Sequence, residues 1–97
     1  MKVKVKDKRI KLVMTTVPGD QVKGLQPNEV ERIRFRVDVL IDAETLKQVA
    51  DAFPQWRVHK WKGKVQWSID VLGNTRLLFD YEGKTHEVSA MIYDDPH

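Results

Sequence analysis

The sequence predicts a single α+β domain in which two N-terminal helices pack on one face of a four- to five-stranded antiparallel sheet. Residues 65–71 alternate apolar and polar side chains, which is typical of a half-buried strand. Residues 29–53 instead carry apolar side chains at helical spacing in two successive runs. A chain of 97 residues can bury one modest core and not two, so we expect residues 1–97 to form one domain.

The first 25 residues predict a short edge strand followed by an irregular stretch. Val3 and Val5 alternate with lysines, and such lysines keep an edge strand from pairing with other chains. Residues 10–14 form a second short element, and the sequence leaves open whether it is a strand or a helix. Residues 15–25 contain two glycines and a proline, so we expect a loop there.

A helix is predicted to start near Asn28, which can act as its N-cap, with Glu31 three residues later as in a capping box. The next run of residues fits two patterns. Apolar residues at 33, 35, 37, 39 and 41 alternate as in a strand, whereas those at 30, 33, 37, 40 and 41 form one helical stripe. The cap and the acidic first turn favour the helix. A second helix is expected over residues 43–53, ending at Pro54.

As a helix, this segment leaves Phe35 and Val39 together on its more exposed side. An exposed apolar pair is more often incidental than functional. The functional alternative is a contact with a partner protein.

Residues 56–81 predict three antiparallel strands joined by turns. Gly63 and the pair Gly73-Asn74 mark the two turns, because Gly and Asn tolerate positive φ at little cost. A last strand is expected over residues 85–93. Strict alternation in that strand places Met91 on the same face as Glu87 and Ser89.

The formal net charge of +3 is unevenly distributed along the chain. Residues 1–24 hold seven Lys or Arg against two acids, and residues 56–81 hold five against two, while the remaining segments are acidic overall. A positive face suits a polyanion such as nucleic acid, because each neutralised phosphate releases counterions. The alternative is that the lysines only keep the protein in solution.

The composition also indicates the cellular compartment in which we expect the protein. The chain has no cysteine, which fits a reducing environment. Its N-terminus carries lysines without the apolar run of a signal peptide, and no stretch approaches the length of a membrane span. We therefore expect a cytoplasmic protein without a membrane partner.

Four segments in the second half of the chain carry a family resemblance: RVHKWKG (57–63), QWSI (66–69), NTRLLF (74–79) and YDDPH (93–97). In this order they resemble the HigB branch of the RelE/ParE toxin superfamily, whereas the first half is similar only in the order of its elements. The resemblance implies a RelE-like fold. It also implies the toxin of a type II toxin–antitoxin system, an endoribonuclease that cuts mRNA on the ribosome without metal or cofactor. The implied partners are the ribosome, mRNA and a cognate helix-turn-helix antitoxin, which alone would connect the toxin to operator DNA.

Metal-independent RNA cleavage needs a base for the 2′-hydroxyl, an acid for the leaving 5′-oxygen and cations for the developing phosphorane charge. Histidine is the natural acid or base near neutral pH, and Arg or Lys supplies the charge. The resemblance implies the catalytic candidates His59, Asp95, His97 and Arg76, and leaves open which residue is base and which is acid. The RNA-binding candidates are Lys60, Lys62, Lys64 and Trp61, and the antitoxin-contact candidates are Phe35 and Val39.

Each catalytic candidate has an ordinary structural alternative. A sheet histidine is usually a surface residue, a terminal histidine usually frays, and Arg76 can pair with Asp70 or Asp80 across strands. The three histidines and the terminal acids fit no compact ligand motif, so no metal site is expected.

The chain departs from the family pattern in ways that keep other functions open. Pro96 stands where the family has tyrosine, Thr75 where it has tryptophan, and Trp61 where it has an aliphatic residue. The missing hydroxyl favours a second hypothesis, a non-catalytic RelE/ParE-fold binding module such as a gyrase inhibitor or a degenerate toxin. A third is an antitoxin or another RNA-binding partner. The nuclease hypothesis requires the rings of His59 and His97 to meet over a cationic patch.

Overall fold

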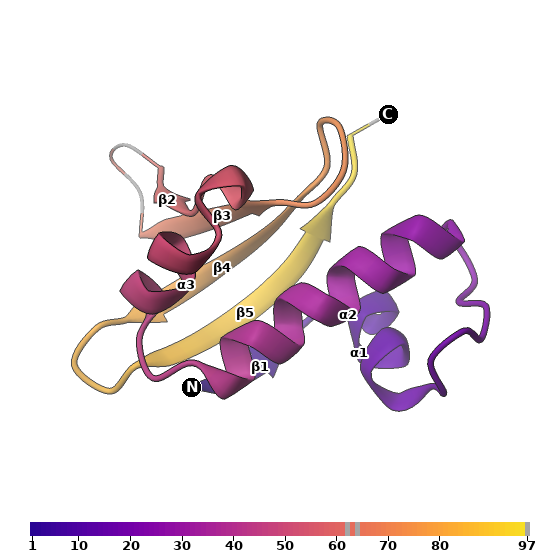
Figure 1. Ribbon diagram of the computed structural model, residues 1–97, viewed down its shortest axis with the longest axis horizontal. Helices are drawn as coiled ribbons and strands as arrows, with labels where there is room; N and C mark the ends of the chain where they lie inside the picture. Colours follow the sequence, from indigo (N-terminus) through magenta and orange to yellow (C-terminus); the bar gives the residue numbers. More distant parts are fainter. Residues whose placement is uncertain (62, 64, 97) are drawn as a thin grey trace.

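The computed structural model of the chain describes residues 1–61, 63 and 65–96, which form three helices and a five-stranded mixed sheet (Figure 1). The elements in chain order are β1 (Lys2–Val5), α1 (Lys8–Thr15), α2 (Pro27–Asp42), α3 (Leu46–Ala52), the 3₁₀ turn η1 (Pro54–Trp56), β2 (His59–Lys60), β3 (Gln66–Asp70), β4 (Arg76–Glu82) and β5 (Glu87–Asp94). The predicted α+β class is therefore confirmed.

The sheet has the strand order β1-β5-β4-β3-β2. Strands β2 to β5 form the antiparallel meander that the sequence predicts. Strand β1 instead runs parallel to β5, with Lys2 opposite Glu87 and Val3 opposite Val88. The prediction of a wholly antiparallel sheet is wrong at this edge. A parallel pair needs a long crossover, and here all the intervening elements supply it.

Residues 10–14, which the sequence left open, lie in helix α1. Asp7 is the N-cap, and its carboxylate accepts a hydrogen bond from the Arg9 amide at 2.8 Å. Ile10 and Val13 point from this helix into the core and are fully buried. The described residues therefore form three α-helices rather than the two that were predicted.

Helix α2 begins slightly earlier than expected. Gln26 is the N-cap, Pro27 takes the first helical position, and the Glu29 carboxylate accepts the Gln26 amide at 2.9 Å. Proline suits that position because its missing N–H would have had no helical partner. Asn28 and Glu31 are thus not the capping pair. The helical interpretation itself is confirmed, since the stripe Val30, Ile33, Val37 and Leu40 is buried.

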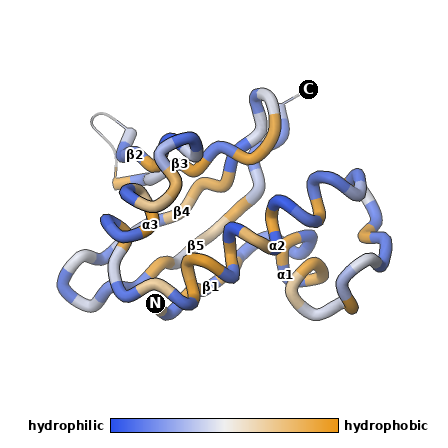
Figure 2. Tube along the Cα trace, in the orientation of Figure 1, coloured by the Kyte–Doolittle hydropathy of each residue, from blue (hydrophilic) through white to orange (hydrophobic). Residues whose placement is uncertain are grey.

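The core lies between these helices and one face of the sheet. Apolar residues recur along α2 and β5 where the two lie near one another, whereas the turn between β4 and β5 is hydrophilic (Figure 2). The sheet contributes Ile69, Leu77, Phe79, Val88 and Met91, none of them exposed. We call the opposite side of the sheet the open face; it carries alternate residues of β3 and β4.

Strand β5 does not alternate strictly. Ala90 has a φ of 52°, and the β4–β5 register shifts between Leu78 and Asp80. This irregularity turns Met91 to the core side together with Val88. The prediction that Met91 shares a face with Glu87 and Ser89 is therefore wrong.

We expect Phe79→Ala to lower the free energy of unfolding by about 3–5 kcal/mol, because the phenyl ring is fully buried and its removal leaves a cavity. Val65→Ala, at a side chain 72% exposed, should change it by less than about 0.5 kcal/mol. Urea unfolding of both variants measures the contrast. Equal effects of the two substitutions would contradict the core as described.

Candidate functional site

His59 lies on the open face at the end of a row of cross-strand neighbours. It pairs with Ser68, Ser68 pairs with Leu78, and Leu78 pairs with Ile92. Directly paired residues project to the same side of a sheet. The imidazole is exposed. The predicted position of His59 on a sheet face is thus confirmed, and its face is the one opposite the helices.

The backbone just before β2 orients the His59 ring. Its Nδ1 lies 2.6 Å from the carbonyl oxygen of Arg57, and that residue adopts a left-handed conformation with φ 51°. A carbonyl oxygen only accepts hydrogen bonds, so Nδ1 carries the proton in the neutral ring and Nε2 keeps its lone pair. Left-handed backbone at a residue other than glycine is uncommon and costs energy. In the neutral ring the turn thus leaves Nε2 as the nitrogen that can accept a hydrogen bond.

Arg76 lies in the next row of the open face, between Asp70 on β3 and Asp94 on β5. Its Nε is 3.7 Å from Asp94 Oδ2, and its Nη2 donates to the Asn74 carbonyl at 3.3 Å. The alternative partners considered from the sequence were Asp70 and Asp80, but Asp70 instead forms an ion pair with Arg57 at 3.7 Å. The Arg76 Nε is buried and has no hydrogen-bond acceptor among the described residues.

Trp61 joins these two rows. Its amide donates to the Gln66 carbonyl at 2.9 Å, which places its backbone beyond His59 along β2. Its ring nevertheless contacts the Arg76 guanidinium, 5.6 Å from ring centroid to Cζ. The indole therefore extends back toward Arg76 across the row of Ser68 and Leu78, two side chains that are buried (0% and 7% exposed). His59, Trp61 and Arg76 therefore lie on one face of the sheet.

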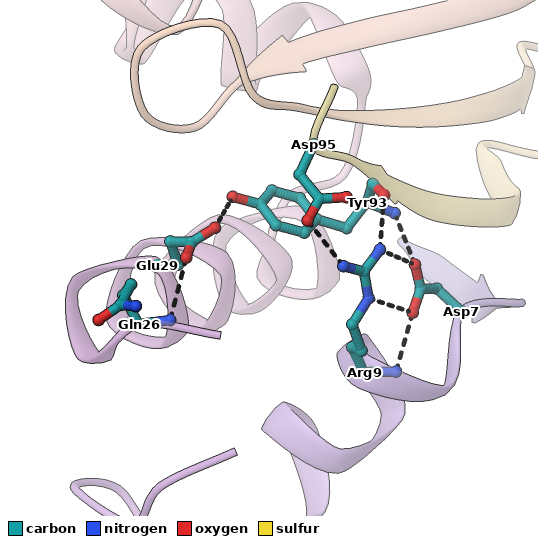
Figure 3. Close-up of polar contacts among 6 residues, drawn as sticks. All are labelled: Asp7, Arg9, Gln26, Glu29, Tyr93 and Asp95. Carbon is teal, nitrogen blue, oxygen red and sulfur yellow. Dashed lines mark hydrogen bonds and ion pairs between the residues drawn. The ribbon is translucent and has the colours of Figure 1, made fainter. Parts of the chain in front are cut away.

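Asp95 is held elsewhere. Its Oδ2 accepts a hydrogen bond from Arg9 Nη1 at 2.9 Å, and Arg9 belongs to α1 (Figure 3). The preceding residue, Asp94, is the one that faces Arg76. The structure therefore brings Arg76 together with Asp94 and directs Asp95 toward the helices. Three other predicted residues, Lys62, Lys64 and His97, lie outside the described part of the chain.

Lys60 and the candidate antitoxin contacts lie apart from this surface. Lys60 is exposed and pairs with Trp67, so it projects to the helix side rather than with His59. Phe35 is 53% exposed, and its ring packs edge-on against Phe53 and Trp56 at 5.7 Å. Val39 packs against the core. Phe35 also lines a groove of about 640 Å³ between residues 18–27 and α2, which contains none of the catalytic candidates.

A network at the end of β5 was not predicted from the sequence. Arg9 also donates to Asp7 Oδ2 at 3.1 Å and to the Tyr93 carbonyl at 3.0 Å, and the Tyr93 hydroxyl donates to Glu29 (Figure 3). Burial, and then the hydrogen bond with Glu29, raise the pKa of Tyr93 to about 12. Hydrogen bonds to Asp7 and Asp95 raise the pKa of Arg9 above its ordinary value. An aspartate just before a helix is a sequence signal for an N-cap, so the capping role of Asp7 could have been predicted from the sequence.

Comparison with known proteins identifies no family. A scan against protein-family models and a search of curated proteins both return no match. In the part of the chain that the structure describes, no group of three His, Asp or Glu residues is placed to hold a metal ion. No helix among those residues is long and apolar enough to cross a membrane.

The Asp7 carboxylate gives a pH-dependent prediction. Burial alone would raise its pKa, but hydrogen bonds from the Arg9 side chain and the Tyr93 and Arg9 amides outweigh burial, so the pKa is lowered from 3.8. Because the Asp7 pKa is lower in the folded protein than in the unfolded chain, the ionised carboxylate stabilises the folded state at pH values above 3.8. This stabilisation is lost as the pH falls from 3.8 through the pKa of the folded protein.

We therefore expect Asp7→Asn, which can still cap α1, to have a lower free energy of unfolding than the wild type at pH 7. The difference in free energy of unfolding between the wild type and Asp7→Asn should become smaller as pH falls below about 4. Urea unfolding of both proteins from pH 7 to pH 2.5 tests this. A gap that stays constant over this range would contradict the charged Asp7 contact.

Proposed function

We propose that the protein is the toxin of a type II toxin–antitoxin system, with a RelE-like fold, which cleaves mRNA on the ribosome without a metal ion. The four HigB-like segments support this function from the sequence. From the structure, the observation that carries it is the shared surface of His59, Trp61 and Arg76, with His59 Nε2 left as an acceptor. A toxin of this kind acts in the cytoplasm, where ribosomes are.

The reaction would proceed by attack of the RNA on itself. His59 Nε2 takes the proton of a 2′-hydroxyl, and the resulting oxygen attacks the adjacent phosphorus. The bond from phosphorus to the 5′-oxygen breaks, leaving a 2′,3′-cyclic phosphate on one fragment. The departing 5′-oxygen takes a proton from an acid, for which His97 is the candidate by resemblance. Arg76 stabilises the charge that develops on the phosphorane oxygens.

The same surface offers contacts for single-stranded RNA. An indole ring stacks on bases without strong sequence preference, and the half-buried Trp61 stands beside the arginine that would hold the phosphate. Lys60 projects to the opposite side of the edge strand β2, so it would contact RNA only where the strand passes around that edge of the sheet; Lys62 and Lys64 come shortly after it in sequence. Shape and charge, more than a closed pocket, would thus position the RNA.

The antitoxin would bind away from this surface. Phe35 lines the groove beside α2, on the helix side of the molecule. A helix-turn-helix antitoxin that inserts an apolar side chain there would leave the open face uncovered, and would link the toxin to operator DNA. Val39 packs against the core and would contribute less to such a contact.

A second candidate is a binding module of the same fold without nuclease activity, such as a gyrase inhibitor. Two observations favour it: Pro96 replaces the family tyrosine, and Asp95 is engaged by Arg9. Mapping of mRNA 5′ ends in a translation reaction separates the two. Discrete cuts within reading frames indicate the nuclease, whereas DNA damage signalling in induced cells without such cuts indicates a gyrase inhibitor.

We expect His59→Ala to lower mRNA cleavage by at least about 100-fold and to abolish growth arrest on induction, because it removes the base. The exposed ring should contribute little to folding, so thermal unfolding should be nearly unchanged.

His86→Asn is the matched control. That histidine has a φ of 54° and contacts Tyr81 rather than the site, and asparagine tolerates this backbone. The control should retain cleavage within a few-fold of the wild type. A His59→Ala protein that folds and remains fully toxic would refute the mechanism.

A further inference from the structure

We propose that Arg9 is a positioning residue for the carboxyl-terminal part of the site, and that Asp95 is its anchor rather than a proton donor or acceptor. This inference rests on the proposed nuclease function. It concerns how residues 93–95 are held, and it gives Asp95 a role different from the one that the resemblance implies.

The guanidinium of Arg9 contacts the terminal segment at two points. Nη1 donates to Asp95 Oδ2 at 2.9 Å, and Nη2 donates to the Tyr93 carbonyl at 3.0 Å. Two contacts to residues two apart fix both the position and the direction of the chain between them (Figure 3). Side-chain exposures of 31% for Arg9 and 22% for Asp95 place this pair in a partly dry environment, where such charge-assisted bonds are stronger than on the surface.

Arg9 is itself held by α1. Its Nη2 and Nε donate to the Asp7 carboxylate at 3.1 and 3.4 Å, and the guanidinium lies over the Tyr93 ring, 5.3 Å from the centroid. Asp7 Oδ2 also accepts the Tyr93 amide at 3.1 Å. The N-cap of α1, the arginine and the end of β5 are therefore one hydrogen-bonded unit, and Arg9 cannot shift without breaking several contacts at once.

The other end of this unit is fixed to α2. The Tyr93 hydroxyl donates to Glu29, whose second carboxylate oxygen accepts the Gln26 amide at the start of that helix. The segment is thus held by two helices up to Asp95. Pro96 then restricts both its own φ and the backbone of Asp95 before it.

The same geometry argues against proton transfer by Asp95. An acid or base must come within about 2.6–3.2 Å of the atom it serves, directly or through one water. The Asp95 carboxylate faces Arg9 on the helix side, whereas His59 and Arg76 lie on the open face with Asp94. The function of Asp95 would be to set the position of the last residues of the chain.

The test compares Arg9→Gln, Arg9→Lys, Asp95→Ala, Asp95→Asn and the Arg9→Gln/Asp95→Ala double variant. Cleavage of mRNA on ribosomes gives kcat, KM and a pH profile, and thermal unfolding shows that each variant is folded at the assay temperature. Misplacement of a reacting group by about 1 Å can lower a rate by about 100-fold. We expect Arg9→Gln and Asp95→Ala each to lower kcat about 10- to 100-fold with KM within about twofold.

The double variant should be no slower than the slower single variant, because both remove the same contact. Asp95→Asn, which keeps an acceptor for Arg9, should lower kcat far less than Asp95→Ala. Arg9→Lys, which can keep only part of the guanidinium contacts, should fall between Arg9→Gln and the wild type. All active variants should keep the shape of the wild-type pH profile. The proposal is overturned if Asp95→Asn is as slow as Asp95→Ala, or if Arg9→Gln cleaves like the wild type.

Failure of the nuclease proposal would be seen separately, as wild-type protein that cleaves no mRNA. In that case amide hydrogen exchange still tests the anchor. Exchange of the Tyr93 amide, which donates to Asp7, should be faster in Arg9→Gln and in Asp95→Ala than in the wild type. Unchanged exchange in both variants would refute the anchor as well.

Discussion

The fold depends on the contacts that β1 and α1 make with the last strand, β5. Strand β1 adds to β5 in parallel, and immediately afterwards Asp7 and Arg9 bind the backbone of Tyr93. These contacts join residues more than 80 positions apart, so forming them costs loop-closure entropy. An isolated ion pair would offset little of this cost, because burying charges costs solvation. Arg9 stabilises this arrangement because its Nε, Nη1 and Nη2 groups all donate hydrogen bonds to described residues.

These contacts with β1 and α1 explain why β5 lies inside the sheet and not at its edge. It has β4 on one side and β1 on the other, and its irregularity at Ala90 turns Met91 to the core beside Val88. A strand with such a kink is weakly specified by its own alternation. Pairing on both edges and the Tyr93 contacts supply the register that the strand's sequence lacks. The helices therefore do more than cover the sheet, since α1 also fixes its last strand.

The sequence predicted the elements better than their mutual arrangement. The stripe from Val30 to Leu40 and the meander of β2 to β4 depend on local periodicity, which a single sequence contains. The parallel β1–β5 pair and the Arg9–Asp95 contact depend on residues distant in sequence, and no local pattern encodes them. Lys60 was different: it is the next residue after His59 in a strand, so the alternation of strand side chains already placed it on the other face.

Asp94 and Asp95 contact different arginines on the two sides of the sheet. Adjacent residues of a strand project to opposite sides, so one acid faces Arg76 and the other Arg9. The Arg76–Asp94 pair is long, at 3.7 Å, and leaves the buried Nε without an acceptor among the described residues. Exposed or half-exposed pairs of this kind contribute little to stability. In the proposed function, a phosphate oxygen would reach this buried Nε only after a shift of the Arg76 side chain, and would then gain a charge-assisted hydrogen bond that Asp94 does not provide. Asp94 would then keep Arg76 in place in the free protein while remaining a weak competitor for the phosphate.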